Sequence, residues 1–344
     1  MSDLKERDTG GATEPLPASP SLLSRVGRFL LRKPESTIAL AAIPIVVYFS
    51  LVSDAFLTSA NLLIISQYLI GPAILAAGQA MLLICGEIDL SMGNVYFMTP
   101  FLVFFAMGAG LPLPVAVLVG VLGAGLVGFL NGAITIGAGI PSFMVTLGMG
   151  FVINGLTLNL SDGFPKRAPS SGLAAQIFGG AAFSGLIWVL LIVAIMHLVL
   201  TQTRWGVYTV AIGGNKIGAT EAGVPSRRIR MRNFIVAAML AGFAGVLEGI
   251  RIGSFDPGAG VAGGKVFESV AAAVIGGTLL TGGYGTIIGA FLGALVLAIL
   301  RDGFVIVGVS AFTYSMVLGA AIIVAMVLNA LAAKARARSQ STRL

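Results

Sequence analysis

Long apolar runs separated by short polar stretches fill this chain from about residue 37 to residue 332. A helix that crosses a bilayer needs about 20 predominantly apolar residues, because lipid cannot satisfy exposed backbone groups. Of the 344 residues, 57% are hydrophobic and only 10% are charged, a composition that soluble domains do not show. The pattern therefore predicts an all-α polytopic membrane protein.

The apolar runs predict about ten transmembrane helices, and their total length permits eight to ten. We place the spans at 37–53, 61–85, 93–110, 113–137, 143–160, 183–200, 233–253, 266–281, 284–301 and 311–332. Several runs are interrupted by Gly or Pro, and the run at 266–281 is short. We expect a broken or re-entrant helix there, surrounded by protein or by a watery cavity.

The basic residues predict the orientation. Of the 21 Lys and Arg, six precede the first span, six lie in 201–232 and four follow the last span. By the positive-inside rule these three segments are cytoplasmic, as are both termini. We therefore expect a disordered cytoplasmic tail at 1–36, a transmembrane domain at 37–332 and a basic cytoplasmic tail at 333–344. Within the domain, 161–182 is expected to be an external loop and 201–232 a cytoplasmic loop. The net charge of +7 then reports topology and contact with anionic lipid, and it does not indicate nucleic-acid binding.

A weak internal repeat relates the two halves of the chain. A shift of 171 residues lays "NGAITIGAGIPSFMVTLG" over "DGFVIVGVSAFTYSMVLG" with four identities, and "AAGQAMLLICGEIDLSMGN" resembles "SVAAAVIGGTLLTGGYG" farther upstream. Repeated halves with Gly-interrupted helices are typical of transport pathways that run between the halves. If five spans separate the repeats, the two halves have opposite orientations.

The polar stretch "GEIDLSMGN" raises the question of two carboxylates, Glu87 and Asp89, at a membrane boundary. Asp89 and Ser91 resemble a helix N-cap region, so we interpret Glu87, Asp89 and Ser91 as a helix-break motif at the cytoplasmic end of the second span. Burying two unpaired carboxylates is costly, and at least one is expected to face water or a helix N-terminus. The alternative is an ion-coupled transporter that uses both carboxylates as proton or cation sites.

The cytoplasmic loop contains "GNKIGATEAGV", the pattern of a short helix that begins after Asn215 and ends before Gly223 and Pro225. This stretch is either an ordinary basic loop or a docking element for another protein. It is not a phosphate-binding loop, because "GGNKIGAT" fails the G-x-x-x-x-G-K-[ST] spacing.

Six stretches in order along the chain carry a family resemblance: "GEIDLSMGN", "GFLNG", "IPSFMVTLGM", "TRWGVYTVAIGGN", "ATEAGVPSRRIR" and "ESVAAAVIGGTLLTGGYGT". Together they resemble the permease subunits of ATP-binding-cassette importers for simple sugars, the ribose, xylose and arabinose group, from about residue 60 to residue 328. The sequence departs from the family pattern at Glu87, Val270 and Asp302.

The resemblance implies a multi-pass protein of the bacterial inner membrane. Two permease chains, identical or homologous, would form the path, with two cytoplasmic ATPase subunits below and a periplasmic sugar-binding protein above. ATP would be bound by the partner ATPase, so this chain needs no cofactor of its own. The loop would contain the coupling helix that fits a groove in the ATPase, and we assign it these residues: Gly214, Asn215, Ala219, Glu221, Ala222 and Gly223.

An uncharged polyol needs hydrogen-bonding groups along a wet path and aromatic faces for its ring. The candidates are Asn94, Asn131, Ser142, Thr146, Asn154, Thr278 and Thr281, with Phe143 and Tyr284 as aromatic partners. Each competes with a role in packing between membrane helices. Three charged pairs, Glu248 with Arg251, Lys265 with Glu268 and Arg301 with Asp302, are expected to be structural ion pairs.

An intramembrane enzyme is disfavoured. It would need a nucleophile with a base, or a metal cluster. The single cysteine, Cys85, and the single histidine, His197, offer neither, so we predict no catalytic and no metal-binding residues.

Overall fold

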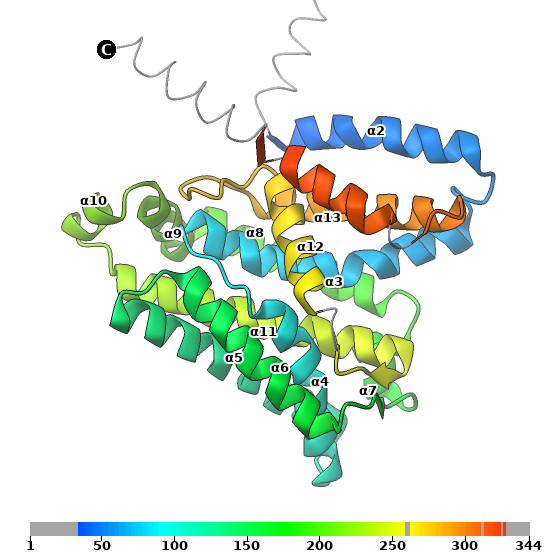
Figure 1. Cartoon of the computed structure of the whole chain (residues 1–344), viewed down its shortest axis with the longest axis horizontal. Helices are drawn as coiled ribbons and strands as arrows, with labels where there is room; N and C mark the ends of the chain where they lie inside the picture. Colours follow the sequence, from blue (N-terminus) through cyan, green and yellow to red (C-terminus); the bar gives the residue numbers. More distant parts are fainter. Residues whose placement is uncertain (1–33, 259–261, 311–312, 325, 328–344) are drawn as a thin grey trace, which may run out of the picture.

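The computed structural model describes residues 34–258, 262–310, 313–324 and 326–327, so most of the two predicted tails lies outside the described residues. Helices make up nearly all of this structure (Figure 1). The longer ones are α2 (Pro34–Val52), α3 (Ser59–Ile84), α4 (Met92–Gly108), α5 (Leu113–Ala138), α6 (Ser142–Ser161), α8 (Ser184–Gln202), α11 (Ser226–Ile252), α12 (Ala262–Ile275), α13 (Ile287–Ile306) and the unlabelled helix Thr313–Val324. The all-α polytopic class is confirmed.

Six of the described helices are long and apolar enough to cross a membrane: α3, α5, α6, α8, α11 and α13. Three shorter apolar helices, Ile38–Val52, Met92–Gly108 and Thr313–Val324, fall on predicted spans as well. The short run at 266–281 gives α12, which ends at Ile275 and is followed by a non-helical turn up to Thr286. This is the broken helix that the sequence predicted.

Helices α3 and α11 run in opposite directions along each other. Gln67, near the start of α3, accepts a hydrogen bond from Arg251 at the end of α11 at 3.0 Å. At the other end, the Asn233 amide donates to the Met81 carbonyl oxygen at 3.3 Å. The end of α3 and the start of α11 therefore lie on the same side of the molecule.

The positions of the helices agree with the internal repeat at a shift of 171 residues. Adding 171 to the bounds of α3, α4 and α5 gives 230–255, 263–279 and 284–309, which overlap α11, α12 and α13. Because α3 and α11 are antiparallel, the two halves are inverted with respect to each other. The upstream stretches "AAGQAMLLICGEIDLSMGN" and "SVAAAVIGGTLLTGGYG" both place a break after a helix, α3 and α12 respectively. They do not correspond under the shift of 171, which places the break after α3 on the segment between α11 and α12.

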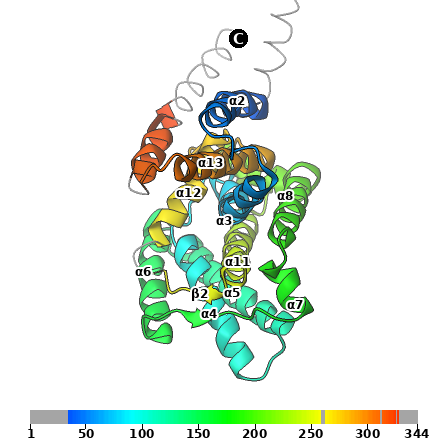
Figure 2. The ribbon, with the colours of Figure 1, turned by 90° about the vertical axis from the view of Figure 1, so that its right-hand side faces the viewer.

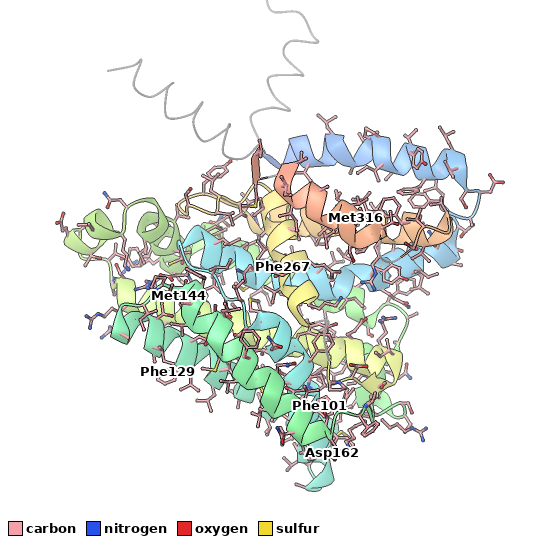
Figure 3. All side chains as sticks on the ribbon, viewed as in Figure 1. Phe101, Phe129, Met144, Asp162, Phe267 and Met316 are labelled. Carbon is pink, nitrogen blue, oxygen red and sulfur yellow. The ribbon has the colours of Figure 1, made fainter. Side chains whose placement is uncertain are left out.

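Helix α11 lies at the centre and packs against α3, α4 and α5. Its approach to α4 is so close that a Cβ at Gly245 would collide with the Tyr96 carbonyl oxygen. Small residues allow this kind of backbone contact between membrane helices. Phe101 is fully buried, whereas Phe129, Met144 and Met316 project from the outside of the molecule (Figure 3). An apolar outer surface of this extent suits contact with lipid or with another membrane chain.

The connecting segments at the two ends of the molecule have different structures. Helices α9 (Arg204–Gly214) and α10 (Lys216–Glu221) form a projection, the knob (residues 203–225), at the left in Figure 1. On the far side, 161–182 contains β1 (Lys166–Arg167), α7 (Leu173–Ala175) and the π-helical turn η1 (Gln176–Gly180). Strand β1 pairs antiparallel with β2 (Ser254–Phe255), which lies beside α4 (Figure 2). The loops 161–182 and 201–232 therefore lie at opposite ends.

Candidate functional site

The "GEIDLSMGN" stretch forms the link between α3 and α4. Asp89 in this link is fully buried. Its Oδ1 accepts hydrogen bonds from the Ser91 N–H at 2.7 Å and from the Ser91 hydroxyl at 2.6 Å, and its Oδ2 accepts one from the Asn131 amide at 3.1 Å. Ser91 is the N-cap of α4, but its hydroxyl donates to Asp89 instead of capping. Asp89 thus lies at a helix N-terminus, where the helix dipole favours a negative charge.

Glu87 forms a buried ion pair with a residue that the sequence did not connect to it. The Arg230 Nε donates to Glu87 Oε1 at 2.6 Å, and each side chain is only 9% exposed. Arg230 lies in the second turn of α11, directly after the knob. The pair therefore ties the link between α3 and α4 to the helix that leaves the knob.

Several candidate cargo residues hold this link in place. The Ser142 hydroxyl accepts the Ile88 N–H at 3.1 Å, and the Thr146 hydroxyl accepts the Leu90 N–H at 2.9 Å. Asn131 donates to Ser91 Oγ at 2.9 Å in addition to Asp89. Side chains of α6 therefore satisfy two backbone N–H groups of the link, and Asn131 of α5 holds two of its side chains.

The remaining candidates do not join this group into a single lined path. Thr278 is buried, Tyr284 half-buried and Thr281 exposed, all in the turn between α12 and α13. Asn94 and Asn154 are half-buried on α4 and α6, and Phe143 is exposed on α6. The turn contacts the end of α3, where the Gly283 N–H donates to the Ile84 carbonyl oxygen at 2.8 Å. A role of these residues in cargo passage stays a prediction.

A cavity of about 1070 Å³ opens on the knob side. It lies between the link, the corner from α5 to α6, and the start of α11, and both Ser142 and Phe143 contribute to its wall. Four basic residues line it: Lys216, Arg227, Arg228 and Arg230. With only Glu87 as an acidic wall residue, the cavity is electropositive.

The knob has the short helix that the sequence predicted. The Asn215 side chain accepts the Gly218 N–H at 2.9 Å and so caps α10, and the chain turns at Gly223 with a φ of 82°. Of the six residues assigned to coupling, Gly214, Asn215, Glu221, Ala222 and Gly223 are exposed. Ala219 is instead buried, and it packs in a small apolar cluster with Ile212 and Ile229.

Ile217 is the knob residue that the sequence reasoning missed. Its side chain is 73% exposed on α10. The signal in the sequence is a lone isoleucine among charged and small residues of a predicted surface helix. Such exposed apolar side chains often supply most of the binding energy of an interface.

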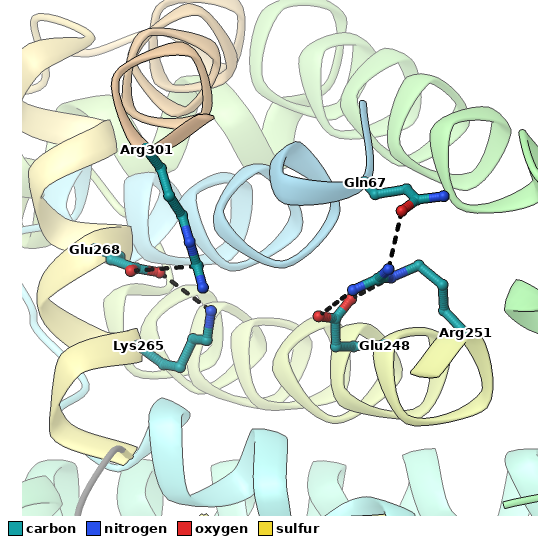
Figure 4. A network of polar contacts seen from close by, with 6 residues as sticks. All are labelled: Gln67, Glu248, Arg251, Lys265, Glu268 and Arg301. Atoms are coloured by element: carbon teal, nitrogen blue, oxygen red, sulfur yellow. Dashed lines mark hydrogen bonds and ion pairs between the residues drawn. The ribbon is translucent and has the colours of Figure 1, made fainter. Parts of the chain in front are cut away.

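Two groups of charged side chains face each other across the interior (Figure 4). In the first, Arg251 donates to both oxygens of Glu248 at 2.9 Å and 2.8 Å and to the Gln67 side chain at 3.0 Å. In the second, Glu268 pairs with Lys265 at 3.2 Å and with Arg301 at 3.9 Å. The predicted pairs Glu248 with Arg251 and Lys265 with Glu268 are confirmed.

The predicted pair of Arg301 with Asp302 is wrong. Adjacent residues on a helix project about 100° apart and do not face each other. Arg301 turns to Glu268, and the buried Asp302 accepts a hydrogen bond from the Asn61 amide at 2.7 Å. Asp302 thereby connects α13 to the start of α3.

No metal-binding group emerges from the described residues, among which no cluster of three or more His, Cys, Asp or Glu side chains occurs. Cys85 is a free, buried thiol at the end of α3. The site is thus built from hydrogen bonds and ion pairs between helices.

Comparison with known proteins finds permease components of transport systems. Residues 61–326 match the family model described as the permease component of branched-chain amino acid transport systems. The chain is 36% identical to the xylose/arabinose import permease of Sulfolobus acidocaldarius over 325 residues, which cover 91% of this chain and 89% of that protein. No solved structure was found to match the chain.

Ribose import permeases are also among the relatives. The chain is 32% identical to that of Escherichia coli K12 over 305 residues, covering 87% of this chain and 93% of the relative. It is 30% identical to that of Bacillus subtilis 168 over 289 residues, covering 83% and 89%. These matches extend over nearly the whole helical domain of the chain.

Proposed function

This chain belongs to the family of permease components of membrane transport systems, and we propose that it carries a monosaccharide or related polyol in an ATP-driven importer. A permease component is a transport subunit and not an enzyme, and it provides the translocation path. The hydrolysis of ATP therefore belongs to a separate subunit. The cargo is proposed from the relatives, whose names specify xylose, arabinose and ribose, all of them neutral sugars.

The working assembly that we propose contains two permease chains, two cytoplasmic ATPase subunits and an extracytoplasmic sugar-binding protein. The membrane is the cytoplasmic membrane, and the knob and both termini face the cytoplasm. The basic cavity supports this orientation, because its Lys216, Arg227 and Arg228 lie on the knob side, where the positive-inside rule places such residues.

The knob is the proposed contact with the ATPase. Its helix α10 is capped by Asn215 and braced by the buried Ala219, so it presents a fixed surface. The exposed Ile217 is suited to fill an apolar pocket in a partner, with Glu221 and Gly223 at its edge. Arg230 lies in α11 directly after the knob and pairs with Glu87 in the interior. This ion pair offers a route by which motion of the knob reaches the translocation path.

The test is co-purification of the permease with its ATPase, followed by sugar uptake in vesicles. The variant Ile217→Asp should lower the amount of bound ATPase by about tenfold, since a charge replaces a buried anchor. The matched control is Leu173→Asp, because Leu173 is equally exposed, at 78% against 73%, but lies on the far side. That variant should bind the ATPase as the wild type does.

Two outcomes would contradict the proposal. The first is an ATPase that never associates with the chain, or uptake that is unaffected by substitutions of Glu221 and Gly223. The second is uptake driven by an ion gradient without ATP, which would favour the ion-coupled alternative at Glu87 and Asp89.

A further inference from the structure

The two charged groups in Figure 4 differ in how completely their hydrogen-bonding capacity is used. In the first, the Arg251 guanidinium donates through Nε and both terminal nitrogens to Glu248 and Gln67. In the second, Lys265 donates a single hydrogen bond, to Glu268. Within the described part of the chain, Arg301 makes no hydrogen bond, and its ion pair with Glu268 is long, at 3.9 Å. N–H groups of Lys265 and Arg301 therefore remain available to donate to another molecule.

Aromatic rings lie beside both of these cations. The Arg301 guanidinium carbon is 4.7 Å from the centroid of the Tyr68 ring, and Lys265 Nζ is 5.9 Å from the centroid of the Tyr96 ring. Both distances are within the range of cation–π attraction. The second group thus gathers the Glu268 carboxylate, the cations Lys265 and Arg301, and the rings of Tyr68 and Tyr96. These side chains come from four helices: α3, α4, α12 and α13.

The Tyr96 hydroxyl is the second, independent sign of a ligand. The side chain is 3% exposed, and among the described residues its hydroxyl has no hydrogen-bond partner. A buried hydroxyl without a partner destabilises a fold, and its presence calls for an occupant or a role.

The position suits the entry of a cargo from outside. Lys265 lies in the first turn of α12 and Arg301 near the end of α13, both away from the knob. The side chains of Lys265, Glu268 and Arg301 are 20%, 11% and 38% exposed, so they are more accessible than Tyr96, which is 3% exposed.

We infer that Lys265, Glu268 and Arg301, with Tyr68 and Tyr96, form a binding site for one monosaccharide inside the permease. This inference rests on the proposed function. The cations donate to sugar hydroxyls and the Glu268 carboxylate accepts from them. The Tyr96 hydroxyl can donate or accept, and the aromatic rings meet the apolar face of the sugar ring. The charged pairs, interpreted from the sequence as purely structural, thus divide into a more fully hydrogen-bonded pair, Glu248 with Arg251, and a binding group.

The decisive variant is Tyr96→Phe, which removes only the unpaired hydroxyl. If the hydroxyl contacts cargo, ATP-driven uptake into vesicles should fall about fivefold, the loss of one neutral hydrogen bond. The melting temperature should stay the same or rise, because an unsatisfied buried group is gone. The matched control is Tyr48→Phe on the exposed face of α2, which should transport as the wild type does.

A second pair of variants separates binding from folding. Glu268→Gln should lower the uptake rate per assembled complex, even where the amount of complex also falls. Glu248→Gln in the other pair should lower the amount of complex and leave the uptake per complex unchanged. Full uptake by both Tyr96→Phe and Glu268→Gln, beside an active wild type, would overturn this inference alone. A wild-type complex that moves no sugar would overturn the proposed function as well.

Discussion

The ion pair between Glu87 and Arg230 gives the sharpest test of how the interior is held together. The variant Glu87→Ala leaves the Arg230 guanidinium buried without its partner. Removing one member of a buried pair costs about 3–5 kcal/mol, because the remaining charge is neither hydrated nor neutralised. Both residues line the 1070 Å³ cavity, which admits some water, so we expect the lower end of that range, about 3 kcal/mol.

A double-mutant cycle isolates the pair. Glu87→Ala with Arg230→Met removes both charges, and replacing a buried ion pair by apolar groups is often close to neutral. We therefore expect the double variant to recover about 2 kcal/mol relative to Glu87→Ala alone. Glu87→Gln keeps an acceptor for Arg230 Nε and should lose less than the alanine variant, about 1–2 kcal/mol.

The assay is reversible unfolding of the purified chain in detergent micelles, followed by its helical circular dichroism. A loss below about 1 kcal/mol for Glu87→Ala would refute the reasoning, since it would mean that water already compensates Arg230. A double variant no more stable than the single one would refute it too, because the cost would then come from lost packing.

Two further changes test the link between α3 and α4. Asp89→Ala leaves the buried Ser91 N–H and hydroxyl without their acceptor and removes one of the two hydrogen bonds of the Asn131 amide. The yield of folded permease, measured by fluorescence-detected gel filtration, should therefore fall much more than cargo preference changes. Normal yield with a switched preference would contradict this. Gly213→Ala would push a Cβ into the Ile84 carbonyl oxygen and should lower the free energy of unfolding in detergent micelles by about 1–3 kcal/mol. The neighbouring Gly214 has open space, so Gly214→Ala should stay within about 0.5 kcal/mol of the wild type. Equal losses for the two variants would show that the close contact of Gly213 with Ile84 does not determine stability.

Local signals in the sequence were sufficient for the class of protein and for several elements. Hydrophobic run lengths predicted the helices, since a spanning helix satisfies its own backbone and needs no information from elsewhere in the chain. The short helix after Asn215 and a break in the short run at 266–281 were also predicted from local residues, although α12 ends at Ile275, before the predicted bound. The pairs Glu248 with Arg251 and Lys265 with Glu268 lie three residues apart, within one helical turn.

Only the tertiary structure decided which distant groups meet. Glu87 and Arg230 are separated by 143 residues, and no local pattern connects them. Arg301 faces Glu268 and not its neighbour Asp302, because the packing of α13 against α12 fixes the direction in which each side chain projects. The sequence determined that this chain builds membrane helices with interrupted ends. The geometry of their packing determined which buried charges find partners and which polar groups, such as the Tyr96 hydroxyl, remain without one among the described residues.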